Sequence, residues 1–284
     1  MNKRKLSIAI PASVVSDTPH LRERTAKIGL IGRAAAIFKV NEIIVYPDVP
    51  KHKQTADADL VAMLLTYMET PQYLRKRLFK IMPELQFAGV LPPLRTSHHP
   101  LNSRKDRLTV GEYREGVALA KTDGSAQVDI GVEQPALVTG MDLSVGKRVT
   151  VRIVEVGKQI KAELAASGEL PSYWGYTVVS EQRPLGKLVA NRHFDLTVAT
   201  SKYGVSFAEA AEQIGDRWRG ASSILVVFGP PTAGLHEIAK REGLSLDRIV
   251  DFVVNTIPGQ GTETVRTEEA LLATLAVLNV RFGL

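Results

Sequence analysis

Cysteine is absent from this chain of 284 residues. Without cysteine there are no disulfides, no zinc sites built from thiolates and no cysteine nucleophile. Long apolar runs are also missing, because none reaches the roughly 18–20 residues that span a membrane. The basic N-terminus leads into an apolar run at 6–11 that is too short for the core of a signal peptide. The sequence therefore predicts a cytoplasmic protein.

Two common phosphate-binding signatures are missing as well. No Gly-Lys-Ser/Thr occurs anywhere, so a Walker phosphate loop is excluded. The glycine-rich stretch Pro258-Gly259-Gln260-Gly261 lacks the third glycine of the dinucleotide fingerprint. Internal repeats and low-complexity tracts are also absent.

Acidic side chains are scarce among the basic ones of the first half of the chain, and the formal net charge is +6 with a sequence pI near 9.4. Charge of one sign on helices favours a polyanionic partner, here a nucleic acid. The segments concerned contain only the acids Glu23, Glu84 and Asp106. Their basic side chains are Arg22, Arg24, Lys27, Arg33, Lys39, Arg75, Lys76, Arg77, Lys80, Arg95, Arg104, Lys105 and Arg107. Those predicted to contact the nucleic acid are Arg22, Arg24, Arg75, Lys76, Arg77, Arg104 and Lys105.

Apolar periodicity predicts an α/β fold. Strands are expected at 6–10, 42–46, 175–180, 194–199, 223–228 and 249–254. Helices are expected at 17–40, 57–68, 72–79, 185–190, 207–214, 236–241 and 268–278. Alternating strands and helices indicate a parallel sheet with helices on both faces.

Between 91 and 161 the helical period is lost. Short strands at 114–120, 126–132, 136–139 and 148–155, separated by turns, predict a small β-barrel. The predicted organisation is an α/β domain formed by 1–94 and 172–284, interrupted by a barrel at 95–171. The segment 143–151 has the look of a strand of the OB fold, which binds single strands through a basic groove and stacked aromatics. Aromatics are few and Tyr113 is the one clear candidate, so the barrel either binds RNA weakly or is a spacer that positions RNA by backbone charge.

Three consecutive strands of the second half each end in a turn of small residues, at 200–204, 229–235 and 255–264. Ligands of open α/β sheets bind outside the carboxyl ends of the strands, so these turns are expected to line one pocket. Hydroxyls and backbone amides dominate there and cations are scarce. That composition suits adenine and ribose better than a triphosphate.

The stretch 253–270 joins a strand, a Gly-rich loop and a helix. Thr267 is expected to cap the helix, with Glu268 and Glu269 at its positive end. Strand, loop and helix N-terminus together favour a nucleotide pocket, although an ordinary loop and capped helix explain the same residues. Glu268 and Glu269 are either bases or stabilisers of the helix end.

Several long motifs resemble the SPOUT RNA methyltransferases, and more narrowly their archaeal and eukaryotic subfamily with an inserted OB-like barrel. In the C-terminal half these are Thr200-Ser201-Lys202-Tyr203-Gly204, Val226-Val227-Phe228-Gly229 with Gly234-Leu235, and the run from Asn255 to Ala270. In the N-terminal half they are Lys27-Ile28-Gly29, Gly32-Arg33-Ala34-Ala35-Ala36-Ile37-Phe38, Thr70-Pro71-Gln72-Tyr73-Leu74-Arg75-Lys76 and Leu91-Pro92-Pro93-Leu94.

The resemblance implies a C-terminal trefoil knot, bound S-adenosylmethionine and a homodimer that holds RNA between its subunits. It assigns donor binding to Thr200, Gly229, Gly234, Leu235, Asn255, Thr256, Ile257, Gly261, Thr264 and Val265. Relatives often carry Thr-Ser-Glu-Arg-Gly in the first of these loops, so Tyr203 stands where they have arginine. Tyr203 is expected either to stack on a base or adenine, or to pack as an ordinary half-buried tyrosine.

Methyl transfer from a sulfonium needs alignment rather than a covalent nucleophile, which fits a chain without cysteine. A uridine N3 or a ribose hydroxyl would need a nearby cation or donor. Arg33 and Arg266 are the catalytic candidates, and the alternative is that they bind phosphate or an internal carboxylate. No metal is expected, because the adjacent His98 and His99 diverge and no carboxylates accompany them.

The sequence therefore predicts an S-adenosylmethionine-dependent RNA methyltransferase acting on ribosomal RNA, with uridine N3 and a ribose hydroxyl as candidate acceptor atoms. The alternative is a non-catalytic RNA-binding or ribosome-assembly factor that keeps the fold. Donor-dependent methylation separates the two.

Overall fold

The computed structural model describes residues 4–49, 54–122, 124–166, 168–230 and 232–284. The chain divides into two compact units. The sheet unit comprises Met1–Met68, Glu84–Pro93 and Tyr176–Leu284, and the barrel unit comprises Glu69–Pro83 and Leu94–Gly175. The domain limits expected from the sequence, 1–94 with 172–284 for the α/β domain and 95–171 for the barrel, stay a prediction.

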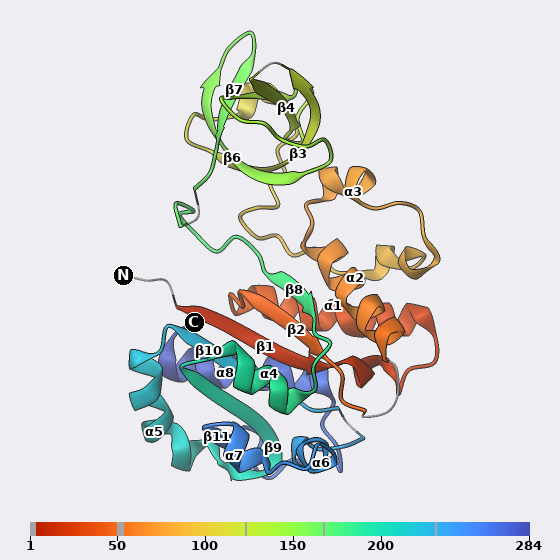
Figure 1. Ribbon diagram of the computed structural model, residues 1–284, viewed down its shortest axis with the longest axis vertical. Coiled ribbons are helices and arrows are strands. Elements are labelled where there is room, and N and C mark those ends of the chain that lie inside the picture. The colour runs from red at the N-terminus through yellow and green to blue at the C-terminus, as the bar shows by residue number, and fades with distance from the viewer. Residues whose placement is uncertain (1–3, 50–53, 123, 167, 231) are drawn as a thin grey trace. The chain divides into compact units, whose positions relative to one another are not determined.

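A sheet of six parallel strands forms the sheet unit, as predicted (Figure 1). The strands are β1 (Lys5–Pro11), β2 (Glu42–Tyr46), β8 (Thr177–Ser180), β9 (Leu196–Ser206), β10 (Ser223–Val227) and β11 (Phe252–Asn255), in the order β11-β9-β10-β1-β2-β8. The central strand β1 is buried on both faces, because Ile8, Ala9 and Ile10 are fully inaccessible. This burial is what a parallel sheet covered on both sides requires.

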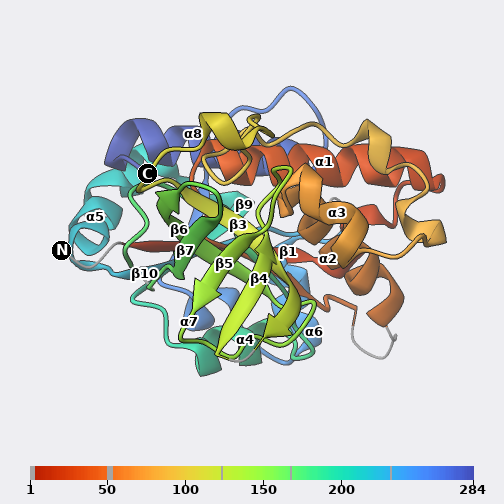
Figure 2. The same cartoon turned by 90° about the horizontal axis from the view of Figure 1, so that it is seen from above.

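Helices cover both faces of this sheet. Its helices are α1 (Leu21–Ile37), α2 (Thr55–Glu69), α4 (Leu185–Arg192), α5 (Phe207–Gly220), α6 (Leu235–Arg241), α7 (Leu246–Ile249) and α8 (Thr267–Phe282). On one face, α4, α6 and α7 pack against a core that includes Ile44, Leu225 and Val227. On the other face, α1 and α8 lie side by side (Figure 2). Short 3-10 turns occupy Ala12–Val15, Pro83–Leu85, Ala88–Val90 and Lys105–Arg107.

The predicted barrel is confirmed as five strands closed in the order β3-β4-β5-β7-β6. The strands are β3 (Tyr113–Thr122), β4 (Ser125–Asp129), β5 (Ala136–Thr139), β6 (Arg148–Val156) and β7 (Ile160–Leu164), and β7 is the one that the sequence analysis did not predict. Alternate residues such as Val128, Val151 and Ile153 fill its core. Helix α3 (Gln72–Leu78) joins this unit through Tyr73, whose hydroxyl donates to the carbonyl oxygen of Glu115 at 2.8 Å.

Three predicted boundaries at the edge of the sheet are wrong, although the elements themselves are present. Strand β9 does not end at 199 but continues to Ser206, because it pairs with β11 across a shift in register between Val253 and Val254. The strand predicted at 249–254 exists as β11, but it begins at Phe252 and ends at Asn255, because α7 extends to Ile249. The N-cap of α8 is Arg266, and Thr267 is the first helical residue.

In the described part of the chain, every helix falls short of the length and hydrophobicity that a bilayer span requires.

Candidate functional site

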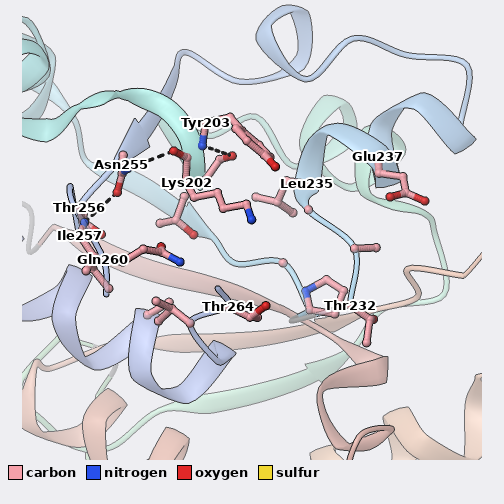
Figure 3. A pocket seen from close by; sticks show the side chains of 18 of the residues that line it. Lys202, Tyr203, Thr232, Leu235, Glu237, Asn255, Thr256, Ile257, Gln260 and Thr264 are labelled. Carbon is pink, nitrogen blue, oxygen red and sulfur yellow. Dashed lines mark hydrogen bonds between the residues drawn. The ribbon is translucent and has the colours of Figure 1, made fainter. Parts of the chain in front are cut away.

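A cavity of about 390 Å³ opens beside the middle of β9 and at the carboxyl ends of β10 and β11 (Figure 3). It brings together nine of the ten residues predicted to bind a methyl donor: Thr200, Gly229, Gly234, Leu235, Asn255, Thr256, Ile257, Thr264 and Val265. The tenth, Gly261, lies in the same loop but outside the lining. The three segments thus meet at one edge of the sheet, which is the usual place for a ligand of an open α/β sheet.

Side-chain hydrogen bonds hold these segments in place. The hydroxyl of Thr200 donates to the carbonyl oxygen of Val227 at 3.0 Å and so ties β9 to β10. The Asn255 side-chain amide donates to the Lys202 carbonyl at 3.1 Å, and its oxygen accepts from the backbone N–H of Ile257 at 2.9 Å. Asn255 therefore fixes two walls of the cavity at once. Such fixed walls spare a ligand the entropy of ordering the loops.

Gly204 allows the closest approach in this region. A Cβ at this position would lie 2.7 Å from the Val253 carbonyl oxygen and from backbone atoms of Val254. The contact occurs where β9 and β11 shift register, so the extension of β9 depends on a residue without a side chain.

The first turn of α8 closes the cavity. The hydroxyl of Thr267 donates to the carbonyl oxygen of Gly229 at 2.9 Å, which binds the helix to the loop after β10. The backbone N–H of Arg266 donates to the Glu269 carboxylate at 2.9 Å, so Glu269 satisfies one of the free donors at the helix start. Thr267 therefore works as a tie between segments rather than as the cap that the sequence predicted.

Glu268 turns away from the cavity towards α1. Its carboxylate lies 3.6 Å from the ammonium of the buried Lys27, which also binds the Asp17 carboxylate at 2.7 Å. Burial raises the pKa of Glu268, and the Lys27 charge only partly offsets this effect. Burial also acts to raise the pKa of Asp17, but the hydrogen bond from Lys27 leads the effects that bring it below its ordinary value. Neither Glu268 nor Glu269 is in the cavity lining.

The two catalytic candidates also lie outside the lining. Arg33, in α1, donates to the carbonyl oxygen of Pro93 at 3.1 Å. Arg266 is exposed at the start of α8, directly after the lining residue Val265.

The predicted RNA-contact residues differ in their exposure and in whether their side chains bind other parts of the chain. In the sheet unit, Arg22 is exposed, whereas Arg24 donates to the Thr18 carbonyl at 2.5 Å and lies 3.7 Å from Asp57. In the barrel unit, Lys76 is exposed on α3. The others there have internal partners: Arg75 with the Thr70 carbonyl, Arg77 with Asp129, Arg104 with Asp106 and Lys105 with Gln134.

The sequence analysis missed the charged groups of the cavity. Lys202, Glu237 and Glu263 all line it. The Lys202 ammonium points into the cavity, 3.4 Å from the Glu263 carbonyl oxygen and 5.1 Å from the ring centroid of Tyr203 (Figure 3). Tyr203 is 75% exposed, so it is not a packed tyrosine. The lysine stood in a quoted motif, but its direction depends on the extension of β9.

A second cavity, of about 370 Å³, shares Thr232 and Ala233 with the first. Its most buried acid is Asp48, whose carboxylate accepts from the Ser13 hydroxyl at 2.5 Å and from the Gln54 amide at 3.0 Å. These contacts make Asp48 a structural support of the loop after β2.

His98 and His99 belong to a polar cluster of the barrel unit. Both Nε2 atoms lie within hydrogen-bonding distance of the Glu69 carbonyl oxygen, at 2.9 and 2.6 Å. Burial lowers the pKa of His99 to about 4, so this ring is neutral at physiological pH. Arg148 bridges the carboxylates of Glu69 and Glu115 at 2.6 Å each. The described residues contain no group of three or more histidines and acids placed to hold a metal ion.

Comparison with known proteins gives one family and several long matches. Residues 5–278 match the family model described as "Putative RNA methyltransferase". An uncharacterized protein of Halobacterium salinarum is 35% identical over 293 residues, which cover 96% of this chain and 98% of that protein. The protein named 28S rRNA (uridine-N(3))-methyltransferase in Homo sapiens is 34% identical, covering 96% of this chain and 77% of the relative. The Drosophila melanogaster protein of the same name is 33% identical, covering 98% and 62%.

Proposed function

Since this chain belongs to the RNA methyltransferase family whose model it matches over 5–278, we propose that it methylates N3 of a uridine in ribosomal RNA, with S-adenosylmethionine as the donor. The uridine and the atom come from the names of the human and Drosophila relatives, which align with nearly all of this chain. The observation that carries the proposal is the cavity beside β9 and at the ends of β10 and β11, whose lining residues all lie within the segment that matches the family.

The cavity fits a donor of this kind. Its volume of about 390 Å³ lies in the range of small-molecule sites. Hydroxyls and amides of Thr200, Asn255 and Thr256 suit a ribose and an adenine, and Leu235 and Ile257 offer apolar contacts to a ring. We assign donor binding to the nine lining residues given above, together with Gly261 from the same loop.

S-adenosylmethionine supplies a methyl group on a positively charged sulfur, ready for in-line displacement. The protein's task is to hold N3 of the uracil in line with that methyl group and to stabilise the charge that N3 carries after losing its proton. We assign to Arg33 of α1 and to Arg266, the residue before α8, the role of cations that contribute to this charge stabilisation. The alternative for both is binding of an RNA phosphate.

Finer features of the fold belong to the same proposal. We expect the SPOUT class with a C-terminal trefoil knot, in which the chain after β11 passes through the loop before it. The all-parallel sheet with β9 and β10 between β11 and β1 supports this class. An OB-like fold for the barrel is supported by its five strands and their order.

We also propose a homodimer. The neighbouring helices α1 and α8 expose apolar side chains that a lone subunit would leave in water, including Leu30 and Ile37 on α1 and Leu272 and Val280 on α8. Leu271, Leu275 and Leu278 of the apolar C-terminal run are buried and belong to the core. The cytoplasmic location stays a prediction.

RNA contact is assigned to Arg22, Arg24, Arg75, Lys76, Arg77, Arg104 and Lys105. The exposed Arg22 and Lys76 are the first to test, because neither side chain forms an ion pair with another described residue that a phosphate would have to break. Replacing a phosphate-binding cation weakens RNA binding about evenly across sequences and lowers the salt dependence.

A methylation assay tests the proposal. The purified chain is incubated with radiolabelled S-adenosylmethionine and ribosomal RNA from a strain lacking it, and the labelled nucleoside is identified. Label in 3-methyluridine supports the proposal, and Gly234→Trp, which would fill the cavity, should abolish it. Tight RNA binding without any label would favour the assembly-factor reading instead.

A further inference from the structure

Tyr203 stands out among the aromatic side chains. It is the one tyrosine, tryptophan or phenylalanine with an exposed side chain in the described part of the chain. It lies in the lining of the cavity rather than on a remote surface (Figure 3). An exposed ring beside a binding cavity provides a flat apolar face on which a nucleobase can stack.

The backbone that carries Tyr203 is fixed. Strand β9 continues past the cavity because Gly204 packs against the backbone of β11. The Lys202 carbonyl accepts from Asn255, and the Tyr203 N–H donates to the Ser201 hydroxyl at 3.2 Å. The ring is therefore presented by an ordered strand, which lowers the entropy cost of binding a base against it.

Lys202 places a positive charge beside this ring. Its ammonium lies 5.1 Å from the ring centroid, a cation–π distance, and 3.4 Å from a carbonyl oxygen of Glu263. Lys202 forms no ion pair with a carboxylate among the described residues. Its charge thus stays available to an anionic ligand at the mouth of the cavity.

The volume of the cavity indicates where the donor and the acceptor base would each bind. A volume of about 390 Å³ accommodates one small molecule, so an RNA base must meet the donor at the mouth. A sulfonium donor is itself positively charged near its methyl group, whereas a uracil that has lost its N3 proton carries negative charge on N3, O2 and O4. An exposed cation therefore suits the acceptor better than the reacting part of the donor.

We propose that Tyr203 and Lys202 form the platform for the acceptor uracil, with the Tyr203 ring stacked on the base and the Lys202 ammonium stabilising its N3-deprotonated form. This inference rests on the proposed function and names the residues that recognise its substrate. It also gives a role to the two positions at which this chain carries Lys-Tyr instead of the Glu-Arg of related loops.

The chemistry is balanced without a further reactant. The N3–H bond breaks and its proton passes to water at the mouth of the cavity. The N3 electron pair forms the N–CH3 bond, while the electrons of the S–CH3 bond return to sulfur and leave a neutral thioether. Lys202 keeps its proton throughout and acts on the charge of the base.

The test compares five variants of the full chain in the methylation assay, each with its donor affinity measured separately. They are Lys202→Gln, Lys202→Arg, Tyr203→Leu, Tyr203→Phe and, as a control on an exposed lysine of α4, Lys187→Ala. Lys202→Gln should lower kcat about 100-fold at neutral pH, the scale for loss of one charge-stabilising group. Lys202→Arg should retain most of the rate, and Lys187→Ala should match the wild type.

The pH profile gives the sharper readout. Without Lys202 the uracil loses its proton less readily, so the rise of rate with pH should move to higher pH and high pH should restore part of the activity. The other ionisable groups around Lys202 are the Tyr203 phenol, Glu263 in the 255–266 loop and Glu237 on α6. All three remain in Lys202→Gln, so a shifted profile reports the loss of the ammonium.

The ring has its own prediction. Tyr203→Leu should raise the KM for RNA about tenfold, from the loss of one base-stacking contact. Tyr203→Phe should stay within about threefold of the wild type, since the stacking face remains. Donor affinity should change less than twofold in all five variants.

Two results would overturn the platform. A matching fall in donor affinity for Lys202→Gln or Tyr203→Leu would make these residues part of the donor site, and unchanged kcat, KM and pH profile would deny them any role. An inactive wild type would instead refute the proposed function. In that case binding of a uridine-rich oligonucleotide decides, because Tyr203→Leu must still weaken it about tenfold for the platform to stand.

Discussion

The barrel unit and the cavity of the sheet unit differ in how their polar side chains are arranged. In the barrel unit most charged side chains are paired with one another: Arg148 with Glu69 and Glu115, Arg152 with Glu163, and Lys161 with Glu155. At the carboxyl edge of the sheet unit, hydroxyls, amides and the Lys202 ammonium surround an open cavity. The candidate cavity is therefore a feature of the sheet unit.

The barrel accordingly lacks the features of a generic single-strand binder. Its one aromatic candidate, Tyr113, lies edge-on to Trp174 at 6.2 Å and is half-buried. The face of β4 and β5 presents Gln127, Leu137 and Thr139 rather than cations or rings. Of the two readings left open by the sequence, these contacts favour a spacer over a stacking surface.

The largest expected effect concerns the polar cluster around Arg148, which we expect to stabilise the barrel unit without affecting donor binding. Arg148→Met removes the bridge between two buried carboxylates and should destabilise the barrel unit by about 3–5 kcal/mol, because both acids then lose the arginine that balances their charge. Donor affinity should stay unchanged. Urea unfolding followed by Trp174 fluorescence and calorimetry with the donor measure the two effects. Arg152→Met, which breaks an exposed pair, is the matched control and should cost less than about 1 kcal/mol.

Gly204→Ala should weaken donor binding and leave the barrel unit's stability unchanged, the reverse of Arg148→Met. The added Cβ would lie 2.7 Å from backbone of β11, so β9 must move and distort the cavity wall. We expect donor affinity to fall at least about tenfold, equivalent to about 1.4 kcal/mol, with the unfolding of the barrel unchanged. Gly220→Ala, at a helical glycine with open space around it, is the control. Equal donor affinity in both variants would show that β9 and β11 do not shape the site.

Thr267→Val tests the tie between α8 and the loop after β10. It removes the hydrogen bond to the Gly229 carbonyl and keeps the side-chain shape, which should cost about 1 kcal/mol. Because the Gly229 loop lines the cavity, part of that loss should be seen as weaker donor binding in calorimetry. A loss of stability with wild-type donor affinity would limit Thr267 to a purely structural role.

The smallest effect concerns Glu268. Its pKa is raised on folding by burial, so its ionised form lowers stability at pH values above the folded pKa. The penalty fades as the pH falls through that value and is gone below the unfolded value. Glu268→Gln should therefore raise the stability at pH 7 slightly and approach the wild type near pH 4. Thermal unfolding across this range gives the difference, and a destabilised variant at pH 7 would mean that the Lys27 contact outweighs burial.

The sequence was sufficient where an element depends on its own residues. Strand β2 at Glu42–Tyr46 and strand β5 at Ala136–Thr139 were predicted to the residue, because β-rich apolar runs end there at turn residues. It also predicted that the turns at 200–204, 229–235 and 255–264 line one cavity, since parallel strands share their carboxyl edge, and the family resemblance supplied the nine lining residues.

It failed where an element depends on a distant partner. The extension of β9 comes from pairing with β11, some fifty residues later, and the direction of Lys202 follows from it. The ion pairs of Arg77 and Arg104, which reduce their freedom to bind RNA, likewise follow from tertiary contacts or local folding that no charge pattern reveals.

The most direct test of the account is the modification of ribosomal RNA in cells. Ribosomal RNA from a strain lacking this chain should lose one 3-methyluridine, detected by mass spectrometry of RNA fragments, and the wild-type chain should restore it. Lys202→Gln should restore it poorly, and Lys187→Ala fully. An unchanged set of 3-methyluridines in the deletion strain would contradict the account.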